Sequence, residues 1–129
     1  YKLKPFDIVL IMTGADKFWG KAEYFDAGCG MGRESTLWLV EKGIRVMGID
    51  SWGWDRPFWA IKKAFAETGD RKILWEAHLA GIEREYCHLE KLANLDKLPR
   101  PFGFKIACFP VKLTGGSAGW CRAVAIMDK

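Results

Sequence analysis

Two histidines and one glutamate are the residues of this chain whose types and spacing can support metal chemistry. His78 and His88 are the only histidines, and Glu90 follows His88 by two positions. His78 lies late in a predicted helix, whereas Glu90 comes just after a short predicted strand. Neutral imidazole and carboxylate together suit Zn²⁺, Mn²⁺ or a similar divalent ion. Because a helix histidine and a strand-end glutamate can converge on one ion, His78 and Glu90 are the candidate metal ligands.

The same residues also have purely structural interpretations. His78 can be an amphipathic histidine at a helix end, and Glu90 can be a solvated carboxylate paired with Lys91. His88 shares the strand face of Glu90, because side chains two positions apart in a strand point the same way. It can therefore support the metal ligands or simply pack. The spacing of these residues leaves both interpretations open.

A glycine-rich segment carries a second pattern with chemical meaning. Gly28, Gly30 and Gly32 alternate within residues 26–33, and Asp50 ends the next predicted strand. This resembles the glycine-rich motif of class I methyltransferases, in which an acidic residue on the next strand holds the ribose of S-adenosylmethionine. The segment 21–25 before the glycines, however, is a poor buried strand. A plain loop that leads into a helix is the preferred interpretation, and the methyltransferase stays as an alternative.

The elements that must position these residues can be predicted from hydrophobic runs and turn residues. Short apolar runs bounded by turn residues predict buried strands. Glycines that follow an amphipathic stretch predict helix ends, here at Gly43 and Gly69. Alternating strands and helices, followed by strands, predict a mixed α/β domain. We predict strands over 7–12, 44–49, 86–89, 104–111 and 123–127, helices over 34–42, 58–67 and 72–80, a loop over 15–33 and a turn over 95–101.

Composition and charge exclude several classes of protein. The 129 residues are 50% hydrophobic and 28% charged, which fits one folded domain over 1–129. The net charge of +4 comes from interspersed signs, so we expect no nucleic-acid partner. No apolar run approaches the ~20 residues that span a bilayer. No segment resembles a secretory signal and no cysteine pair has the C-x-x-C spacing, so we expect a cytoplasmic protein without a membrane partner.

A set of segments spread over nearly the whole chain forms a recognisable order. These segments are Asp7–Gly14, the glycine-rich loop and helix, Gly48-Ile49-Asp50, His78, His88–Leu95, Gly103–Lys105, Phe109–Leu113, Gly115–Gly119 and Arg122–Ala125. Their order resembles the cyclase family of metal-dependent hydrolases, which includes bacterial kynurenine formamidase, isatin hydrolase and trans-dienelactone hydrolase. The resemblance implies a swivelling β/β/α fold of the mixed α/β class.

The resemblance implies roles for the candidate metal ligands. His78 and Glu90 match the downstream metal-site pair of the family, with Zn or Mn as the cofactor. Glu90 would be a ligand, and His78 would be a ligand or a proton shuttle to the leaving group. Both are therefore predicted to be catalytic residues.

The substrate-binding residues are predicted less directly. Asp50 and the stretch from Trp52 to Trp54 match a family segment near the substrate pocket. Trp52, Trp54 and Phe58 can form an apolar substrate wall, with ordinary core packing as the alternative. Arg122 can meet a substrate carboxylate through bidentate hydrogen bonds, with a plain surface arginine as the alternative.

The sequence departs from the family pattern in one respect. The main metal motif of the family, His-x-Gly-Thr-His-x-Asp-x-Pro, does not occur here, and the chain begins at Tyr1 rather than Met. We therefore expect the C-terminal portion of a longer cyclase-family domain, inactive by itself. The intact protein would use a metal-activated water to cleave an amide C–N, ester or lactone bond of a small molecule. We expect a homodimer or larger assembly, and a non-catalytic binding module is a further alternative.

Overall fold

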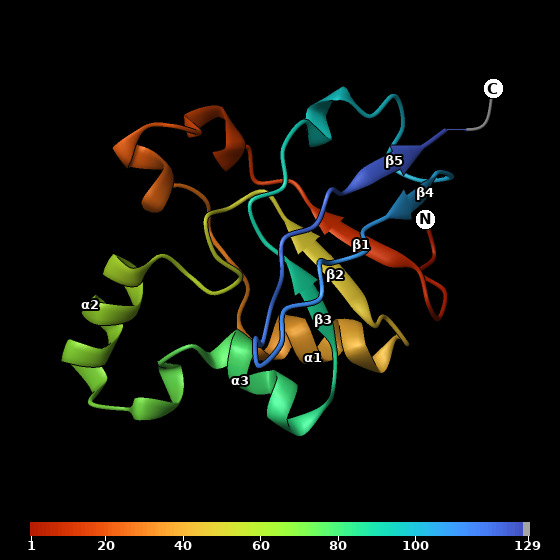
Figure 1. The fold of residues 1–129 in the computed structure, drawn as a ribbon. Helices are drawn as coiled ribbons and strands as arrows, with labels where there is room; N and C mark the ends of the chain where they lie inside the picture. The colour runs from red at the N-terminus through yellow and green to blue at the C-terminus, as the bar shows by residue number, and fades with distance from the viewer. Residues whose placement is uncertain (128–129) are drawn as a thin grey trace. The chain divides into compact units, whose positions relative to one another are not determined.

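The computed structural model describes residues 1–127 (Figure 1). The chain divides into two compact units, Tyr1–Asp96 and the residues from Lys97 onward. Parallel strands connected by helices, followed by an antiparallel strand pair, confirm the mixed α/β class. The single domain over 1–129 stays a prediction, and its last two residues lie outside the described part of the chain.

A parallel three-stranded sheet forms the centre of the first unit. Its strands are β1 (Ile8–Ile11), β2 (Val46–Ile49) and β3 (Cys87–Leu89), in the order β1-β2-β3. Leu10 pairs with Gly48, which pairs with Leu89. All three strands were predicted, and each is shorter than predicted. Their arrowheads point the same way (Figure 1), so the residues that follow the strands meet at one edge of the sheet.

Two of the three predicted helices end close to the glycines that were predicted to end them. These are α1 (Arg33–Glu41) and α2 (Phe58–Thr68). Gly43 and Gly69 follow them with φ of 85° and 66°, a left-handed conformation that only glycine adopts easily.

The third predicted helix is displaced along the chain. The segment Arg71–Ile73 forms a short 3₁₀ turn, whose start is capped by the Asp70 side chain. Trp75 then adopts a left-handed φ of 53°, and α3 runs over Glu76–Glu83 instead of 72–80. The predicted loop 15–33 also contains two 3₁₀ turns, Ala15–Phe18 and Ala22–Phe25.

The core of the first unit packs helices against one face of the sheet. Met47 and Ile49 alternate along β2 and are fully buried. They belong to one cluster with Leu39 and Val40 of α1 and Ala77 of α3. Each large buried aliphatic side chain contributes about 1.5–3 kcal/mol to folding. Ala77 thus fixes α3 against the sheet, and His78 is the next residue of this helix.

The second unit contains a short antiparallel pair. Strand β4 (Lys105–Ala107) pairs with β5 (Val124–Ile126), and both are shorter than the strands predicted there. An isolated bridge between Pro110 and Cys121 extends this pair. No helix within residues 1–127 is long and apolar enough to cross a membrane.

Candidate metal and substrate site

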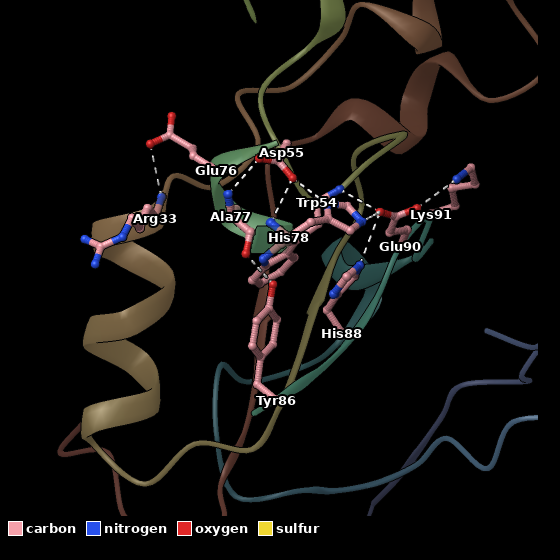
Figure 2. A network of polar contacts seen from close by, with 10 residues as sticks. All are labelled: Arg33, Trp54, Asp55, Glu76, Ala77, His78, Tyr86, His88, Glu90 and Lys91. Atoms are coloured by element: carbon pink, nitrogen blue, oxygen red, sulfur yellow. Dashed lines mark hydrogen bonds and ion pairs between the residues drawn. The ribbon is translucent and has the colours of Figure 1, made fainter. Parts of the chain in front are cut away.

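The candidate ligands meet at the carboxyl edge of the parallel sheet. Glu90 directly follows β3, and the loop from Ser51 to Pro57 follows β2. His78 lies in the first half of α3 and points toward the same place (Figure 2). Ligands in open α/β sheets commonly bind at this edge, because the loops there are free to vary.

The side chains of His78, His88 and Glu90 form one cluster. The Oε1 atom of Glu90 lies 3.6 Å from Nε2 of His78 and 3.4 Å from Nε2 of His88. One ligand atom from each residue lies within 4.8 Å of the others. The structure thus brings the predicted pair together and adds His88 to it.

Asp55 orients the imidazole of His78. Its side chain is almost fully buried, and one of its oxygens, Oδ2, contacts Nδ1 of His78. The hydrogen bond to Asp55 raises the pKa of His78, and burial opposes it only in part. Because Nδ1 faces Asp55, Nε2 faces Glu90 and His88 (Figure 2). A carboxylate behind a histidine is the usual way in which proteins orient a metal ligand.

Asp55 also caps α3. The backbone N–H groups of Ala77 and His78 donate to its two carboxylate oxygens at 2.7 and 3.1 Å. Trp75, the residue before α3, makes no side-chain cap of its own. Sequence reasoning missed Asp55, although a carboxylate after a buried parallel strand is a usable signal.

Glu90 is ionised in this environment. Burial by itself raises the pKa of Glu90, but contacts with His88, the Trp54 N–H and Lys91 outweigh it and lower the pKa to about 2. The Trp54 N–H donates to Oε1 at 2.9 Å, and the Lys91 ammonium donates to Oε2 at 3.2 Å. A carboxylate that is ionised at neutral pH needs no proton loss before it binds a cation.

His88 is fixed by an aromatic stack. Its ring lies nearly parallel to the indole of Trp54, at an angle of 16° and a centroid distance of 5.3 Å. The ring of His78 meets it edge-on, with centroids 4.6 Å apart. The sequence left open whether His88 supports the metal ligands or only packs. In the structure the ring of His88 packs on Trp54, and its Nε2 also lies 3.4 Å from Glu90.

A cavity of about 270 Å³ lies beside the cluster. His78, Glu90 and Asp55 contribute to its wall. The predicted wall residues Trp52, Trp54 and Phe58 also line it, together with the aromatic residues Phe25 and Trp75, which were not predicted.

The aromatic rings of this cavity pack against one another. Phe25 stacks on Phe58 at 5.4 Å and meets Trp52 edge-on at 4.8 Å. Phe58 in turn contacts Trp75 at 6.2 Å. Phe25, Phe58 and Trp75 are each partly exposed, so the cavity is open to solvent. Its walls suit a small flat ring.

Of the other two predicted substrate residues, Asp50 lies outside the cavity wall and Arg122 belongs to the second unit. Asp50 is completely buried, and its Oδ1 accepts from the N–H and hydroxyl of Thr13 at 2.8 and 2.6 Å. The Gly14 N–H donates to Oδ2 at 2.7 Å, so this carboxylate ties the end of β1 to the end of β2. Arg122 is an exposed residue of the second unit. Their roles in substrate binding stay predictions.

The glycine-rich loop is explained by its packing. Gly30 has a φ of 63°, and a Cβ there would lie 2.1 Å from the carbonyl oxygen of Asp55. The neighbouring Met31 N–H donates to the Trp54 carbonyl at 2.6 Å. The close approach of these two loops explains why glycine is needed at this position, and a bound cofactor is not needed to explain it. With the Asp50 carboxylate also occupied, no observation favours the methyltransferase alternative.

Comparisons with known proteins show what this chain is similar to. A family model described as "Putative cyclase" matches residues 1–56. Among solved structures, the chain is similar to an isatin hydrolase crystallised with the product analogue thioisatinate, with a TM-score of 0.77 and 26% identity. That match covers 99% of this chain and 48% of the isatin hydrolase, so the chain spans about half its length.

No curated protein sequence gives a significant match. The family match at the N-terminal end and the shared fold along nearly the whole chain are independent findings. Together they confirm the resemblance of this chain to the cyclase family.

Proposed function

We propose that this chain is part of a metal-dependent hydrolase of the cyclase family. The reaction is cleavage of an amide C–N, ester or lactone bond in a small molecule. The observation that carries the proposal is the meeting of His78 and Glu90 at the wall of an aromatic cavity. The match of residues 1–56 to the cyclase family supports it.

The residues present fit a divalent ion such as Zn²⁺ or Mn²⁺. His78 offers Nε2, and Glu90 offers an ionised carboxylate. When bound, such an ion lowers the pKa of a coordinated water and polarises a carbonyl. Asp55 keeps the His78 imidazole in the orientation that binding requires. The Trp54 N–H holds Oε1 of Glu90 in the same way.

The cavity favours a flat ring next to the bond that is cleaved. Phe25, Trp52 and Phe58 surround the space beside the ligands. A volume of about 270 Å³ suits one or two fused rings rather than a large substrate. Because one similar solved structure is an isatin hydrolase with thioisatinate, ring-fused amides are the first substrates to test. A homodimer or larger assembly in the cytoplasm remains part of the proposal.

The proposal is tested by hydrolysis with the full-length protein. Ring-fused amides, aryl formamides and aromatic lactones are screened with wild type, Glu90→Gln and the control Glu85→Gln. Glu85 is an exposed carboxylate near Glu90 in sequence and outside the cluster. Residues that support a metal ligand typically account for about 10–100-fold in metal affinity or activity. Because Glu90→Gln removes a charged ligand itself, we expect it to lower kcat/KM by at least about 100-fold. Equal activity of Glu90→Gln and Glu85→Gln would contradict the proposal and favour a non-catalytic binding role.

A further inference from the structure

We infer that His88 is a third metal ligand, so that His78, His88 and Glu90 hold one divalent ion on this chain alone. This inference rests on the proposed function, because it concerns the same site. It differs from the prediction made from the sequence, in which His78 and Glu90 were the two metal ligands and His88 was a supporting or packed residue. Two histidines and one glutamate are a known protein ligand set for catalytic zinc.

The spacing of the three side chains carries the inference. The Nε2 atoms of His88 and His78 lie 3.4 and 3.6 Å from Oε1 of Glu90. Good N–H···O hydrogen bonds are shorter, about 2.7–3.2 Å between the heavy atoms. Ligand atoms about 2.0–2.1 Å from a tetrahedral ion lie roughly 3.3–3.4 Å from one another. These two distances match ligands of one ion better than a hydrogen-bonded group, and the ligand atoms of the two histidines lie within 4.8 Å of each other.

Each of the three side chains is oriented by a separate contact. Asp55 holds Nδ1 of His78, and the Trp54 N–H holds Oε1 of Glu90 at 2.9 Å. The indole of the same Trp54 stacks on His88. All three contacts come from two consecutive residues after β2 (Figure 2). Ligands held by their own packing and hydrogen bonds need little rearrangement to bind an ion.

The charges around the cluster allow a cation at Oε1. Lys91 is the basic residue paired with Glu90, and its ammonium contacts Oε2 at 3.2 Å. It also lies over the Trp52 ring, 4.3 Å from the centroid. The Lys91 ammonium therefore occupies a different side of the Glu90 carboxylate from Oε1. An ion bound by Oε1 and the two imidazoles would not have to displace it. The cavity beside His78 leaves room for a water or substrate as a fourth ligand.

Zinc titration of the 129-residue chain by calorimetry tests the inference. His88→Phe keeps a ring to stack on Trp54 but removes the nitrogen. The comparison variants are His78→Phe and Glu90→Gln, with Glu85→Gln as the matched control and circular dichroism as the check of folding. We expect one zinc per wild-type chain and unchanged binding in the control. Supporting residues of metal sites typically account for about 10–100-fold in affinity, so each ligand variant should lose more than about 100-fold.

A measurement on the wild type reports on each histidine directly and complements the variants. Because the chain has only two histidines, its imidazole ¹⁵N spectrum contains one pair of signals for each of them. One equivalent of zinc should shift the Nε2 signals of both rings together. A shift of His78 alone, with His88→Phe binding within about tenfold of wild type, would overturn the third ligand and leave the proposed hydrolase intact. No zinc binding by the wild type would overturn the self-sufficient site, whereas the proposed function would then be decided by the hydrolysis assay of the full-length protein.

Discussion

At the scale of single residues, the carboxylate of Asp55 joins a helix end to an imidazole. It accepts two backbone N–H groups at the start of α3 and contacts Nδ1 of His78. The same buried group therefore fixes both where the helix begins and how the ring is turned. Oδ1 accepts from the Ala77 N–H, whereas Oδ2 contacts both the His78 N–H and Nδ1, so the ring and part of the helix cap depend on the same oxygen.

Asp55→Asn tests the part played by the second oxygen, Oδ2. Asparagine keeps one oxygen to accept from the Ala77 N–H, but its amide NH₂ cannot accept from the His78 N–H or from Nδ1. It also lacks the negative charge that favours the Nδ1–H form of His78. We expect zinc affinity to fall by about 10–100-fold, with part of the His78 population moving its proton to Nε2. Calorimetry and the imidazole ¹⁵N spectrum measure the two effects.

The matched control is Asp70→Asn. Asp70 caps the neighbouring 3₁₀ turn by accepting the Lys72 N–H at 2.9 Å and has no imidazole partner among its hydrogen bonds. This variant should keep the zinc affinity of wild type. If both variants bind zinc equally well, Asp55 has only a structural role.

Residue types left the pairing of His78 and Glu90 open, and the resemblance to the cyclase family favoured it, but neither predicted their surroundings. The two residues are a histidine and a carboxylate placed at element ends, which is visible in the sequence. The contact of Asp55 with Ala77 spans 22 positions, and it exists only because the loop after β2 folds back onto α3. The stack of His88 on Trp54 likewise joins distant segments. Such contacts have no local signal.

At the scale of elements, helices and strands were predicted where a residue next to the element ends it or where the element is itself a short apolar run. The glycines after α1 and α2 and the buried runs of β1 and β2 are examples. The prediction failed for α3, because its cap comes from Asp55 rather than from a neighbouring residue. The left-handed Trp75, which shifts the start of this helix, is equally hard to foresee, since tryptophan rarely adopts that conformation.

Gly30→Ala tests the packing of the glycine-rich loop against the loop after β2. A left-handed φ of 63° and a Cβ position 2.1 Å from the Asp55 carbonyl both oppose alanine there. We expect the free energy of unfolding to fall by about 3 kcal/mol, from about 1 kcal/mol of left-handed strain and a further 1–3 kcal/mol of overpacking. Urea denaturation followed by tryptophan fluorescence measures it.

Gly20→Ala isolates the strain from the packing. Gly20 has a similar φ of 81°, but nothing lies within 4 Å of the position that a Cβ would take there. Alanine there should lower the free energy of unfolding by only about 1 kcal/mol. Equal losses in the two variants would mean that the loop contact at Asp55 is not tightly packed in solution.

At the scale of the whole molecule, the order of elements was enough to predict the mixed α/β class. The division into two units after Asp96 was not predicted, because no Gly- or Ser-rich linker marks it. The aromatic cavity was predicted in part: Trp52 and Phe58 are close in sequence, whereas Phe25 and Trp75 reach it from separate segments. A wall assembled from separate segments follows from the fold and not from any one motif.

The proposed hydrolase depends on a bound metal ion, so removal of that ion by chelation is the first measurement to make. The full-length protein is assayed on a ring-fused amide as purified, after removal of metal verified by elemental analysis, and after Zn²⁺ or Mn²⁺ is restored. We predict that hydrolysis is lost with the metal and returns with one of the two ions, because a bound ion would lower the pKa of a coordinated water and polarise the carbonyl of the substrate. Hydrolysis that continues unchanged in protein shown to be free of metal would contradict the account.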